Sequence, residues 1–249
     1  MRGLFITATD TGTGKTALTA GIAGLLRRGG LDVGVAKPVA TGAHRREGHL
    51  VSLDAQFLKS VSGVSDTRED ICPLVFETPA SPLVAAEHEG KTVDLVRLRA
   101  GLSALAARHD FLLVEGIGGW RVPIAPGFTV RELALELALP VLVIARAGLG
   151  TINHTTLTVE AIRSTGLTIS GVILNCVAFT PEDITTATNA CQIRDLTGVD
   201  VLGTVPFDPQ LSVDEGRPGN ILRCIEDHVN MEPIVRASTS GRIGKWTTS

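Results

Sequence analysis

Residues 8–16, "ATDTGTGKT", end in Gly-Lys-Thr, as phosphate-binding loops do. The strict pattern G-x-x-x-x-G-K-[ST] also needs a glycine at position 9, where this chain has Thr9. The Lys15 ammonium can reach β- and γ-phosphates, and the Thr16 hydroxyl can bind Mg²⁺. Backbone amides that can surround phosphate oxygens belong to four consecutive residues: Gly12, Thr13, Gly14 and Lys15. The stretch therefore predicts a site for the phosphates of a nucleotide.

A carboxylate ends the apolar run in "FLLVEGIGGW" (111–120). Glu115 is expected at the carboxyl end of a strand, where nucleotide hydrolases place an acid that positions a metal. Gly116, Gly118 and Gly119 allow the next loop to pass close to a ligand. Taken alone, the motif fits an ordinary solvated glutamate equally well. Together with a phosphate loop, it favours a metal-positioning carboxylate.

Two more charged residues are expected near the carboxyl ends of predicted strands, as Glu115 is. Lys37, in "VAKPVATG" (35–42), follows a predicted strand and can hold a transferring phosphoryl group or an anionic substrate. The ordinary alternative is a surface lysine. Asp54 comes early in a predicted helix that Ser52 can cap, so it also has a purely structural interpretation. With Thr16 and Glu115 it would give Mg²⁺ three oxygen ligands.

Two loop-to-helix entries complete the candidates, "ETPASPLVAA" (77–86) and "GLGTINHTTLT" (148–158). Each can offer helix N-terminal amides to a carboxylate or phosphate. His154, near the start of the second helix, is interpreted as a structural hydrogen-bonding group rather than a base.

Short, continuously apolar runs alternate with helix-like stretches along the chain. Such runs are typical of strands buried on both faces, so we predict a mainly parallel sheet with helices on both sides, a three-layer doubly wound α/β domain like those of P-loop nucleotide-binding proteins. The predicted strands are 4–8, 33–37, 111–115, 141–145, 171–175 and 201–205. The predicted helices are 15–28, 53–61, 92–108, 130–137, 151–164 and 181–196. Residues 1–225 are expected to form one domain, with 226–249 as a partly mobile extension.

Composition excludes several classes of protein. The 249 residues are 44% hydrophobic and carry a formal charge of −3, so there is no basic excess for nucleic acid. The four cysteines lie far apart without a C-x-x-C motif, which argues against zinc and favours reduced thiols in a cytosol. Apolar runs are too short to cross a membrane, and no leader is apparent. We therefore expect a cytoplasmic protein.

The order and spacing of these motifs resemble dethiobiotin synthetase over residues 4 to about 210. The matching elements are T-D-T-x-x-G-K-T, K-P-V-A-[ST]-G, L-D-A, [ST]-P, V-E-G-x-G-G-W and L-G-x-I-N-H. The resemblance implies an ATP-dependent ligase of biotin synthesis. Its substrates would be 7,8-diaminononanoate and CO₂ or bicarbonate, and its products dethiobiotin, ADP and phosphate. It also implies a homodimer with the substrate near the interface.

The resemblance assigns roles to individual residues. Lys15 and Lys37 would be the catalytic charges, with Lys37 nearest the carbamate. The Mg²⁺ ligands would be Thr16, Asp54 and Glu115. The substrate would contact Thr41, Ser81, Gly150 and Asn153, the last two from the neighbouring subunit. ATP would contact Gly12, Thr13, Gly14, Lys15, Thr16, Ala17, Asp54, Glu115, Gly116, Ile117, Gly118, Asn175, Cys176, Pro206, Phe207 and Asp208. Among these, Asn175 would recognise adenine, and residues 206–208 would form the other wall of the base pocket.

The chain departs from that family at some positions. Position 8 is alanine where some relatives have glycine, and position 12 is glycine where glutamate is frequent. No tyrosine is present, so the substrate contact that some members make with a tyrosine is not predicted within 181–191. A partitioning-type regulatory ATPase is the alternative. That class has a lysine at the position of Asp10, and an acid there cannot stabilise a phosphate across a dimer.

Overall fold

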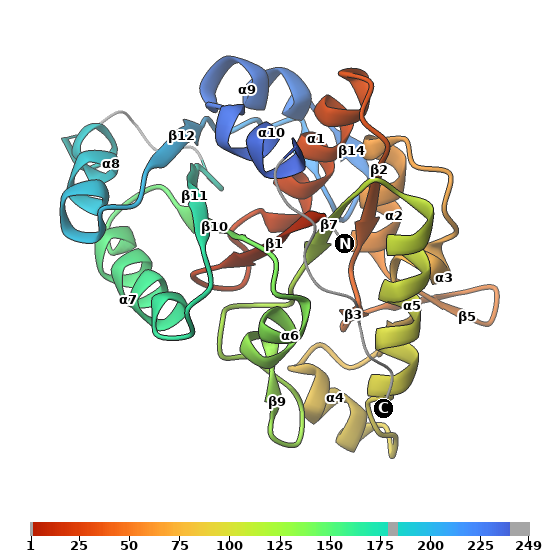
Figure 1. Ribbon diagram of the computed structural model, residues 1–249. Coiled ribbons are helices and arrows are strands. Elements are labelled where there is room, and N and C mark those ends of the chain that lie inside the picture. Colours follow the sequence, from red (N-terminus) through yellow and green to blue (C-terminus); the bar gives the residue numbers. More distant parts are fainter. Residues whose placement is uncertain (1, 179–183, 240–249) are drawn as a thin grey trace.

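The computed structural model describes residues 2–178 and 184–239 (Figure 1). Its centre is a six-stranded, all-parallel sheet in the order β12–β11–β10–β1–β7–β2. In chain order these strands are β1 (Gly3–Ala8), β2 (Val33–Ala36), β7 (Phe111–Glu115), β10 (Val141–Arg146), β11 (Ile169–Asn175) and β12 (Val201–Val205). All six predicted strands are thus confirmed, with ends that move by at most two residues.

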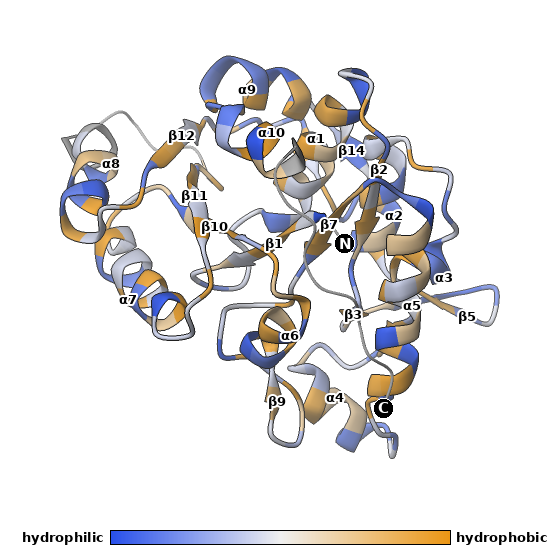
Figure 2. Cartoon of the chain, viewed as in Figure 1, coloured by the Kyte–Doolittle hydropathy of each residue, from blue (hydrophilic) through white to orange (hydrophobic). Residues whose placement is uncertain are grey.

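Helices cover both faces of the sheet, which explains why the strands are apolar throughout. Successive side chains of a strand point to opposite faces, and here each face meets a helical layer. One layer contains α1 (Lys15–Arg28), α2 (Leu53–Ser62), α9 (Ile221–His228) and α10 (Glu232–Thr239). The other contains α5 (Leu95–Arg108), α6 (Val130–Leu137), α7 (Thr151–Arg163) and α8 (Ile184–Thr197). Figure 2 shows hydrophobic residues concentrated on the central strands between these layers.

Smaller elements flank the central sheet. They are β3 (Val39–Ala40), β4 (His44–Arg46), β5 (His49–Val51), α3 (Arg68–Ile71), β6 (Leu74–Val75), α4 (Pro82–His88), β8 (Pro123–Ala125), β9 (Phe128–Thr129), β13 (Leu211–Ser212) and β14 (Arg217–Pro218). α4 begins inside the loop-to-helix entry expected at 77–86. The others were not predicted, because strands of two or three residues and single-turn helices leave too few positions for a periodic pattern.

One predicted helix differs from the structure at its start, and the start of a second cannot be compared because residues 181–183 lie outside the described residues. The helix expected at 92–108 begins at Leu95, because the Asp94 carboxylate accepts a hydrogen bond from the Arg97 amide at 2.9 Å and caps it. The helix expected at 181–196 is described from Ile184 as α8, and Pro181 lies outside the described residues.

The predicted end of the domain at residue 225 falls inside α9. Beyond it, Ile234 in α10 is fully buried among residues of the α1 layer. The fold therefore continues as far as α10. The last ten residues, 240–249, lie outside the described residues. No helix in the described part of the chain is long and apolar enough to cross a membrane.

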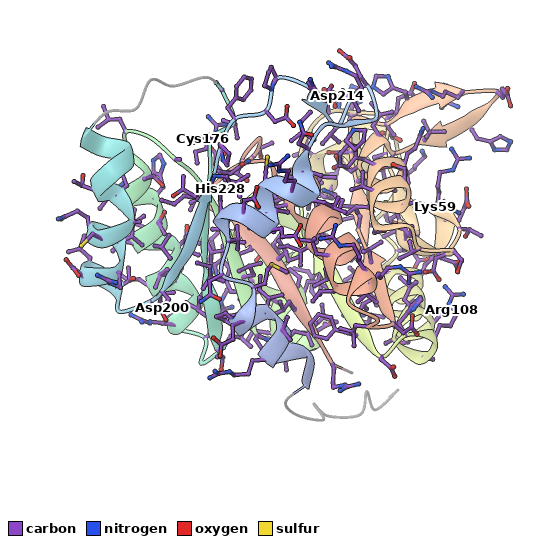
Figure 3. All side chains as sticks on the ribbon, turned by 90° about the horizontal axis from the view of Figure 1, so that it is seen from above. Lys59, Arg108, Cys176, Asp200, Asp214 and His228 are labelled. Carbon is purple, nitrogen blue, oxygen red and sulfur yellow. The ribbon has the colours of Figure 1, made fainter. Side chains whose placement is uncertain are left out.

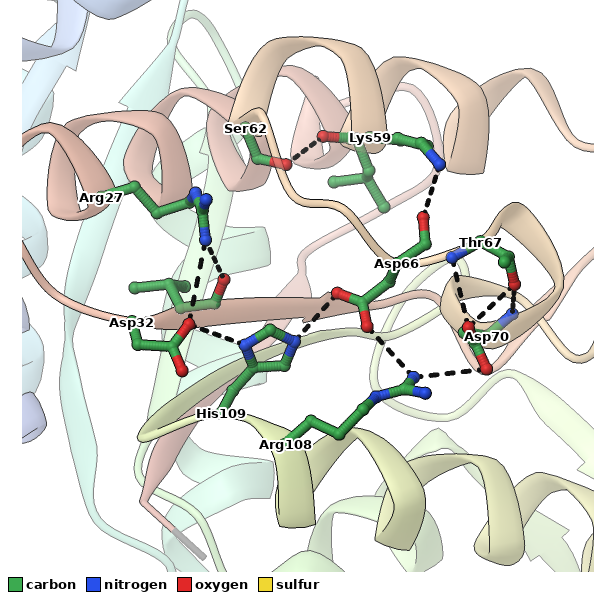
Figure 4. A network of polar contacts seen from close by, with 11 residues as sticks. Arg27, Asp32, Lys59, Ser62, Asp66, Thr67, Asp70, Arg108 and His109 are labelled. Carbon is green, nitrogen blue, oxygen red and sulfur yellow. Dashed lines mark hydrogen bonds and ion pairs between the residues drawn. The ribbon is translucent and has the colours of Figure 1, made fainter.

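A polar network lies at the amino edge of the sheet (Figure 4). The His109 ring contacts Asp32 through Nδ1 at 2.8 Å and Asp66 through Nε2 at 2.9 Å. Arg108 bridges Asp66 and Asp70 at 3.0 and 3.2 Å. Figure 3 shows Arg108 near the same end as Asp200, which precedes β12, and away from Cys176, which follows β11. The network is therefore at the edge opposite the predicted nucleotide site.

Replacing Asp66 with alanine should lower the free energy of unfolding by about 3 kcal/mol, because the Asp66 side chain is only 5% exposed and its loss leaves His109, whose side chain is 9% exposed, without one partner. The matched variant Asp70→Ala removes the other, more exposed partner of Arg108 and a helix-capping contact, and should cost about 1 kcal/mol. Urea unfolding measures both. ADP affinity should stay unchanged in both variants, and equal losses of stability would contradict the prediction.

Candidate active site

The loop between β1 and α1 has the backbone geometry that anion binding requires. Gly12 and Gly14 have φ of +70° and +85°, and α1 begins directly at Lys15. A Cβ on Gly14 would lie 2.1 Å from Nδ2 of Asn175, so only glycine fits there. The Lys15 ammonium donates to the Asp10 carbonyl oxygen at 3.3 Å, which holds it over the loop. The missing glycine at position 9 is thus compensated by two glycines inside the loop.

The predicted charged residues meet at the carboxyl edge of the sheet. The Lys37 Nζ lies 2.8 Å from Oδ2 of Asp54 and 2.5 Å from Oε1 of Glu115. The Thr16 hydroxyl donates to the same Glu115 oxygen at 2.8 Å. Lys37 directly follows β2, and Glu115 ends the adjacent strand β7, so strand order brings them together. Residues 16, 37, 54 and 115 form one cluster, here called the charged cluster.

Burial gives the charged cluster its electrostatic character. The side chains of Lys37 and Glu115 are 5% and 0% exposed, whereas that of Asp54 is 36% exposed. The interpretations of Lys37 as a surface lysine and Glu115 as a solvated acid are therefore wrong. Burial alone would lower the pKa of Lys37, but the carboxylates of Asp54 and Glu115 outweigh it and raise that pKa. Burial would raise the pKa of Asp54, and the Lys37 charge overcomes it and lowers that pKa.

The pKa of Lys15 is shifted in the opposite direction from that of Lys37. Burial, assisted by repulsion from Lys37, lowers the pKa of Lys15 to about 8. A bound phosphate would favour the charged ammonium and raise this pKa again. Below about pH 8, Lys15 is charged before and after binding, and affinity does not depend on its titration. Above that pH, binding must take up a proton.

We therefore expect ADP affinity to be constant near pH 7 and to fall by up to about tenfold per pH unit above pH 8. Titration calorimetry in buffers of different ionisation enthalpy measures both the affinity and the proton uptake. Lys15→Arg is the matched control, because an arginine stays charged and should remove the uptake. If the ADP affinity of the wild type stayed constant to about pH 9.5, ADP binding would not depend on protonation of Lys15, and the prediction would be contradicted.

The charged cluster fits a magnesium ion. In the described part of the chain, Oε2 of Glu115 is buried without a hydrogen-bond partner. Such an oxygen is costly unless something binds it. Carboxylate and hydroxyl oxygens are the ligands that Mg²⁺ prefers, and Thr16 supplies the hydroxyl. The three residues predicted as metal ligands thus lie together and leave one carboxylate oxygen for an ion.

The glycines after Glu115 lie against the phosphate loop, as the sequence suggested. A Cβ on Gly119 would lie 3.4 Å from the carbonyl oxygen of Ala8, and one on Gly118 would lie 3.4 Å from the Thr11 hydroxyl. Gly118 also has a φ of +59°. A Cβ at either position would make only ordinary van der Waals contact with the phosphate loop, and at Gly118 it is the positive φ and a contact of 2.6 Å with Val122 that favour glycine.

Two of the residues predicted to bind adenine make hydrogen bonds within the chain. Asn175 donates from Nδ2 to the Thr13 carbonyl oxygen at 2.9 Å. The Asp208 carboxylate accepts from the amides of Gln210 and Asn220 at 2.8 and 2.6 Å and thereby holds the loop after β12. Phe207 is 39% exposed beside them. Recognition of adenine by these residues stays a prediction.

The predicted substrate residues fall into two groups. Gly42, next to Thr41, donates its amide to the Thr78 carbonyl oxygen at 3.3 Å, so Thr41 is close in structure to the loop that leads to Ser81. Gly150 instead caps α7, on the other side of the phosphate loop. Among the described residues, no hydrogen bond or ion pair joins Gly150 or Asn153 to Lys37.

Sequence reasoning missed Arg146, the last residue of β10. Its guanidinium donates from Nη2 to the Thr11 carbonyl oxygen at 2.9 Å, within the phosphate loop. The available signal was a cation at the end of a predicted strand, the same signal that pointed to Lys37.

A cavity of about 770 Å³ opens elsewhere, between the β4–β5 hairpin, α3 and the start of α5. Ser52 and Ala55, which flank Asp54, line it. Lys15, Lys37 and Glu115 do not. The cavity therefore adjoins α2 and is separate from the charged cluster and the phosphate loop.

A parallel sheet with a Gly-Lys-Thr loop before its first helix and a carboxylate at the end of the adjacent strand defines a P-loop nucleotide-binding protein. A family model described as "AAA domain" matches residues 2–214. The ATP-dependent dethiobiotin synthetase BioD of Anaeromyxobacter dehalogenans (strain 2CP-C) is 43% identical over 89% of this chain and 97% of its own length. That of Bacillus subtilis (strain 168) is 38% identical over 94% and 98%. The chain belongs to the dethiobiotin synthetase family.

Solved structures show the same fold at low sequence identity. The MinD cell division protein of Aquifex aeolicus superposes with a TM-score of 0.56 at 18% identity, covering 98% of this chain and 100% of that one. The ParA family ATPase of Chlorobium tepidum TLS gives 0.53 at 16%, covering 96% and 98%. These similarities establish the architecture only.

Proposed function

We propose that this chain is an ATP-dependent dethiobiotin synthetase. The observation that carries the proposal is the charged cluster, in which a buried lysine and two carboxylates stand beside a phosphate loop. The curated relatives support it, since they are named for this activity and match the chain over nearly their full length. A regulatory ATPase is less well supported, because Asp10 replaces the lysine of that class.

The proposed reaction brings two anions together, a carbamate and the γ-phosphate of ATP. One amine of 7,8-diaminononanoate attacks CO₂, loses a proton and becomes a carbamate. A carbamate oxygen then attacks the γ-phosphorus of ATP, and the bond to the β,γ-bridging oxygen breaks to release ADP. The second amine attacks the carbonyl carbon of the mixed anhydride. The ureido ring closes, phosphate leaves, and that amine loses a proton.

Each cation of the site would offset negative charge during these reaction steps. Lys37, whose pKa is raised, remains an ammonium and can hold the carbamate beside the γ-phosphate. Lys15 would bind the β- and γ-phosphates. A Mg²⁺ ion bound by Thr16, Asp54 and Glu115 would supply charge neutralisation at the phosphates. Holding the two anions together lowers the entropic cost of their meeting.

We also infer a homodimer with the substrate near its interface. Leu149 and Leu157 are 95% and 56% exposed, on either side of Gly150 and Asn153. Burying such apolar side chains against a second copy would be favourable and would bring Asn153 to the other copy's substrate. Four unpaired cysteines support a reducing, cytoplasmic location.

The decisive experiment is product analysis with ATP, Mg²⁺, the diamine and carbon-13-labelled bicarbonate. We expect dethiobiotin labelled at the ureido carbon and one ADP for each product molecule. Omission of the diamine or of bicarbonate should stop ADP release. ATP turnover that ignores the diamine would reject the ligase and favour a regulatory ATPase. Light scattering with and without ATP separates a constitutive dimer from a nucleotide-dependent one.

A further inference from the structure

Two side chains on neighbouring strands hold the carbonyl groups of the phosphate loop. Arg146 ends β10 and pairs in register with Asn175, which ends β11. The Arg146 guanidinium binds the carbonyl oxygen of Thr11, and the Asn175 amide binds that of Thr13, both at 2.9 Å. The two bonds thus fix alternate peptide groups of one short loop.

Fixing these carbonyl groups also fixes the amides that face the opposite way. In a trans peptide, the C=O and N–H groups point in opposite directions. A Thr11 carbonyl held by Arg146 turns the Gly12 amide away from Arg146, and a Thr13 carbonyl held by Asn175 does the same for the Gly14 amide. Successive amides that face one side make an anion-binding concavity. The two side chains therefore preorganise the loop before any phosphate enters.

Strand geometry places the guanidinium on the correct face. Ile144 and Arg146 are two residues apart in β10, so their side chains point to the same face of the sheet. Ile144 packs in the core beneath α1, the helix that follows the phosphate loop. A Cβ on Gly12 would lie 3.2 Å from Nη2 of Arg146. The guanidinium thus lies beside the loop residue whose amide it orients.

Among the residues that the structure describes, the Arg146 guanidinium has one hydrogen-bond acceptor, the carbonyl oxygen of Thr11. A guanidinium has five N–H donors, and one of them accounts for the bond to Thr11. In the part of the chain that the structure describes, no carboxylate pairs with Arg146, whereas Lys37 has two such partners. Its positive charge is therefore not neutralised by a carboxylate of the described residues and adds to the positive potential of the loop.

We propose that Arg146 is a positioning residue for the nucleotide phosphates, which orients the loop amides through Thr11 and adds a third cation to Lys15 and Lys37. This inference rests on the proposed ATP site. It goes beyond the motifs of the loop, because Arg146 comes from a different strand, more than a hundred residues away in sequence. The ligand class is a nucleoside di- or triphosphate, bound through its phosphates.

The test measures binding of three probes to the full chain by calorimetry: ADP, inorganic pyrophosphate and adenosine. In Arg146→Met, affinity for ADP and pyrophosphate should fall by about ten- to a hundredfold, while adenosine should bind as to the wild type. Arg146→Lys keeps the charge and should recover part of the loss for pyrophosphate. The matched control is Arg163→Gln, which removes an exposed charge at the end of α7 and should change nothing.

Unchanged ADP and pyrophosphate affinities in Arg146→Met would overturn the proposal. Equal weakening of adenosine and ADP would also overturn it, since that pattern indicates a distorted site rather than lost phosphate contacts. Failure of the proposed function gives a different result: the wild type would bind ADP but form no dethiobiotin from the diamine. The two failures are therefore distinguishable.

Discussion

Replacing Lys37 with alanine should reduce ring closure by about a hundred- to a thousandfold in kcat, while ADP still binds. The reason is the position of Lys37, 2.5 Å from Glu115 and 2.8 Å from Asp54, at the edge of the sheet where the carbamate and the γ-phosphate would meet. The carbamate and the transferring phosphoryl group would lose a fixed charge that their transition state needs. The phosphate loop and Lys15 would remain to hold ADP. Single-turnover formation of dethiobiotin and ADP calorimetry measure the two effects.

The same substitution should also destabilise the fold by about 3 kcal/mol, since it leaves a fully buried Glu115 without its counter-charge. Asp66→Ala is the matched control, because it should cost similar stability at the opposite edge of the sheet. That control should keep full activity. If Lys37→Ala retained more than about a tenth of wild-type kcat, Lys37 would not be a transition-state charge. If ADP binding disappeared together with activity, the role of Lys37 would be structural.

Replacing Gly14 with alanine should weaken ADP binding by at least about a hundredfold. A Cβ at this position would lie 2.1 Å from the Asn175 amide nitrogen, and the φ of +85° is strained for any other residue. Asn175 must then move, which breaks its bond to the Thr13 carbonyl and releases the loop amides. Calorimetry with ADP measures the loss, and thermal unfolding reports the strain.

Gly63→Ala is the matched control for Gly14→Ala, because it introduces the same backbone strain without a steric clash. Gly63 caps α2 with a similar φ of +71°, but no atom lies within 4 Å of a Cβ built there. It should cost about 1 kcal/mol of stability and leave ADP affinity intact. Wild-type ADP binding in Gly14→Ala, or equal loss in both variants, would contradict the role assigned to the contact with Asn175.

Sequence alone was sufficient for the central fold because strands and helices are encoded by local pattern. Continuous apolar runs predicted the six parallel strands, and the structure confirms each of them. One helix start was misplaced by three residues, since a single cap, Asp94, decides where α5 begins. The C-terminal helices were missed because α10 is short, and its burial depends on residue Ile234 meeting strands that are distant in sequence.

For the site, the chain by itself determined which residues can bind phosphate and metal: the loop that ends in Lys15 and Thr16, a lysine after one strand and a glutamate at the end of another. Residue type and local spacing suffice for that. Only the tertiary structure decided that Lys37 lies between Asp54 and Glu115, and that Arg146 and Asn175 hold the loop. The reason is physical: these contacts depend on the order and register of strands β2, β7, β1, β10 and β11, which bring distant segments within hydrogen-bonding distance and exclude the water that would otherwise screen their charges.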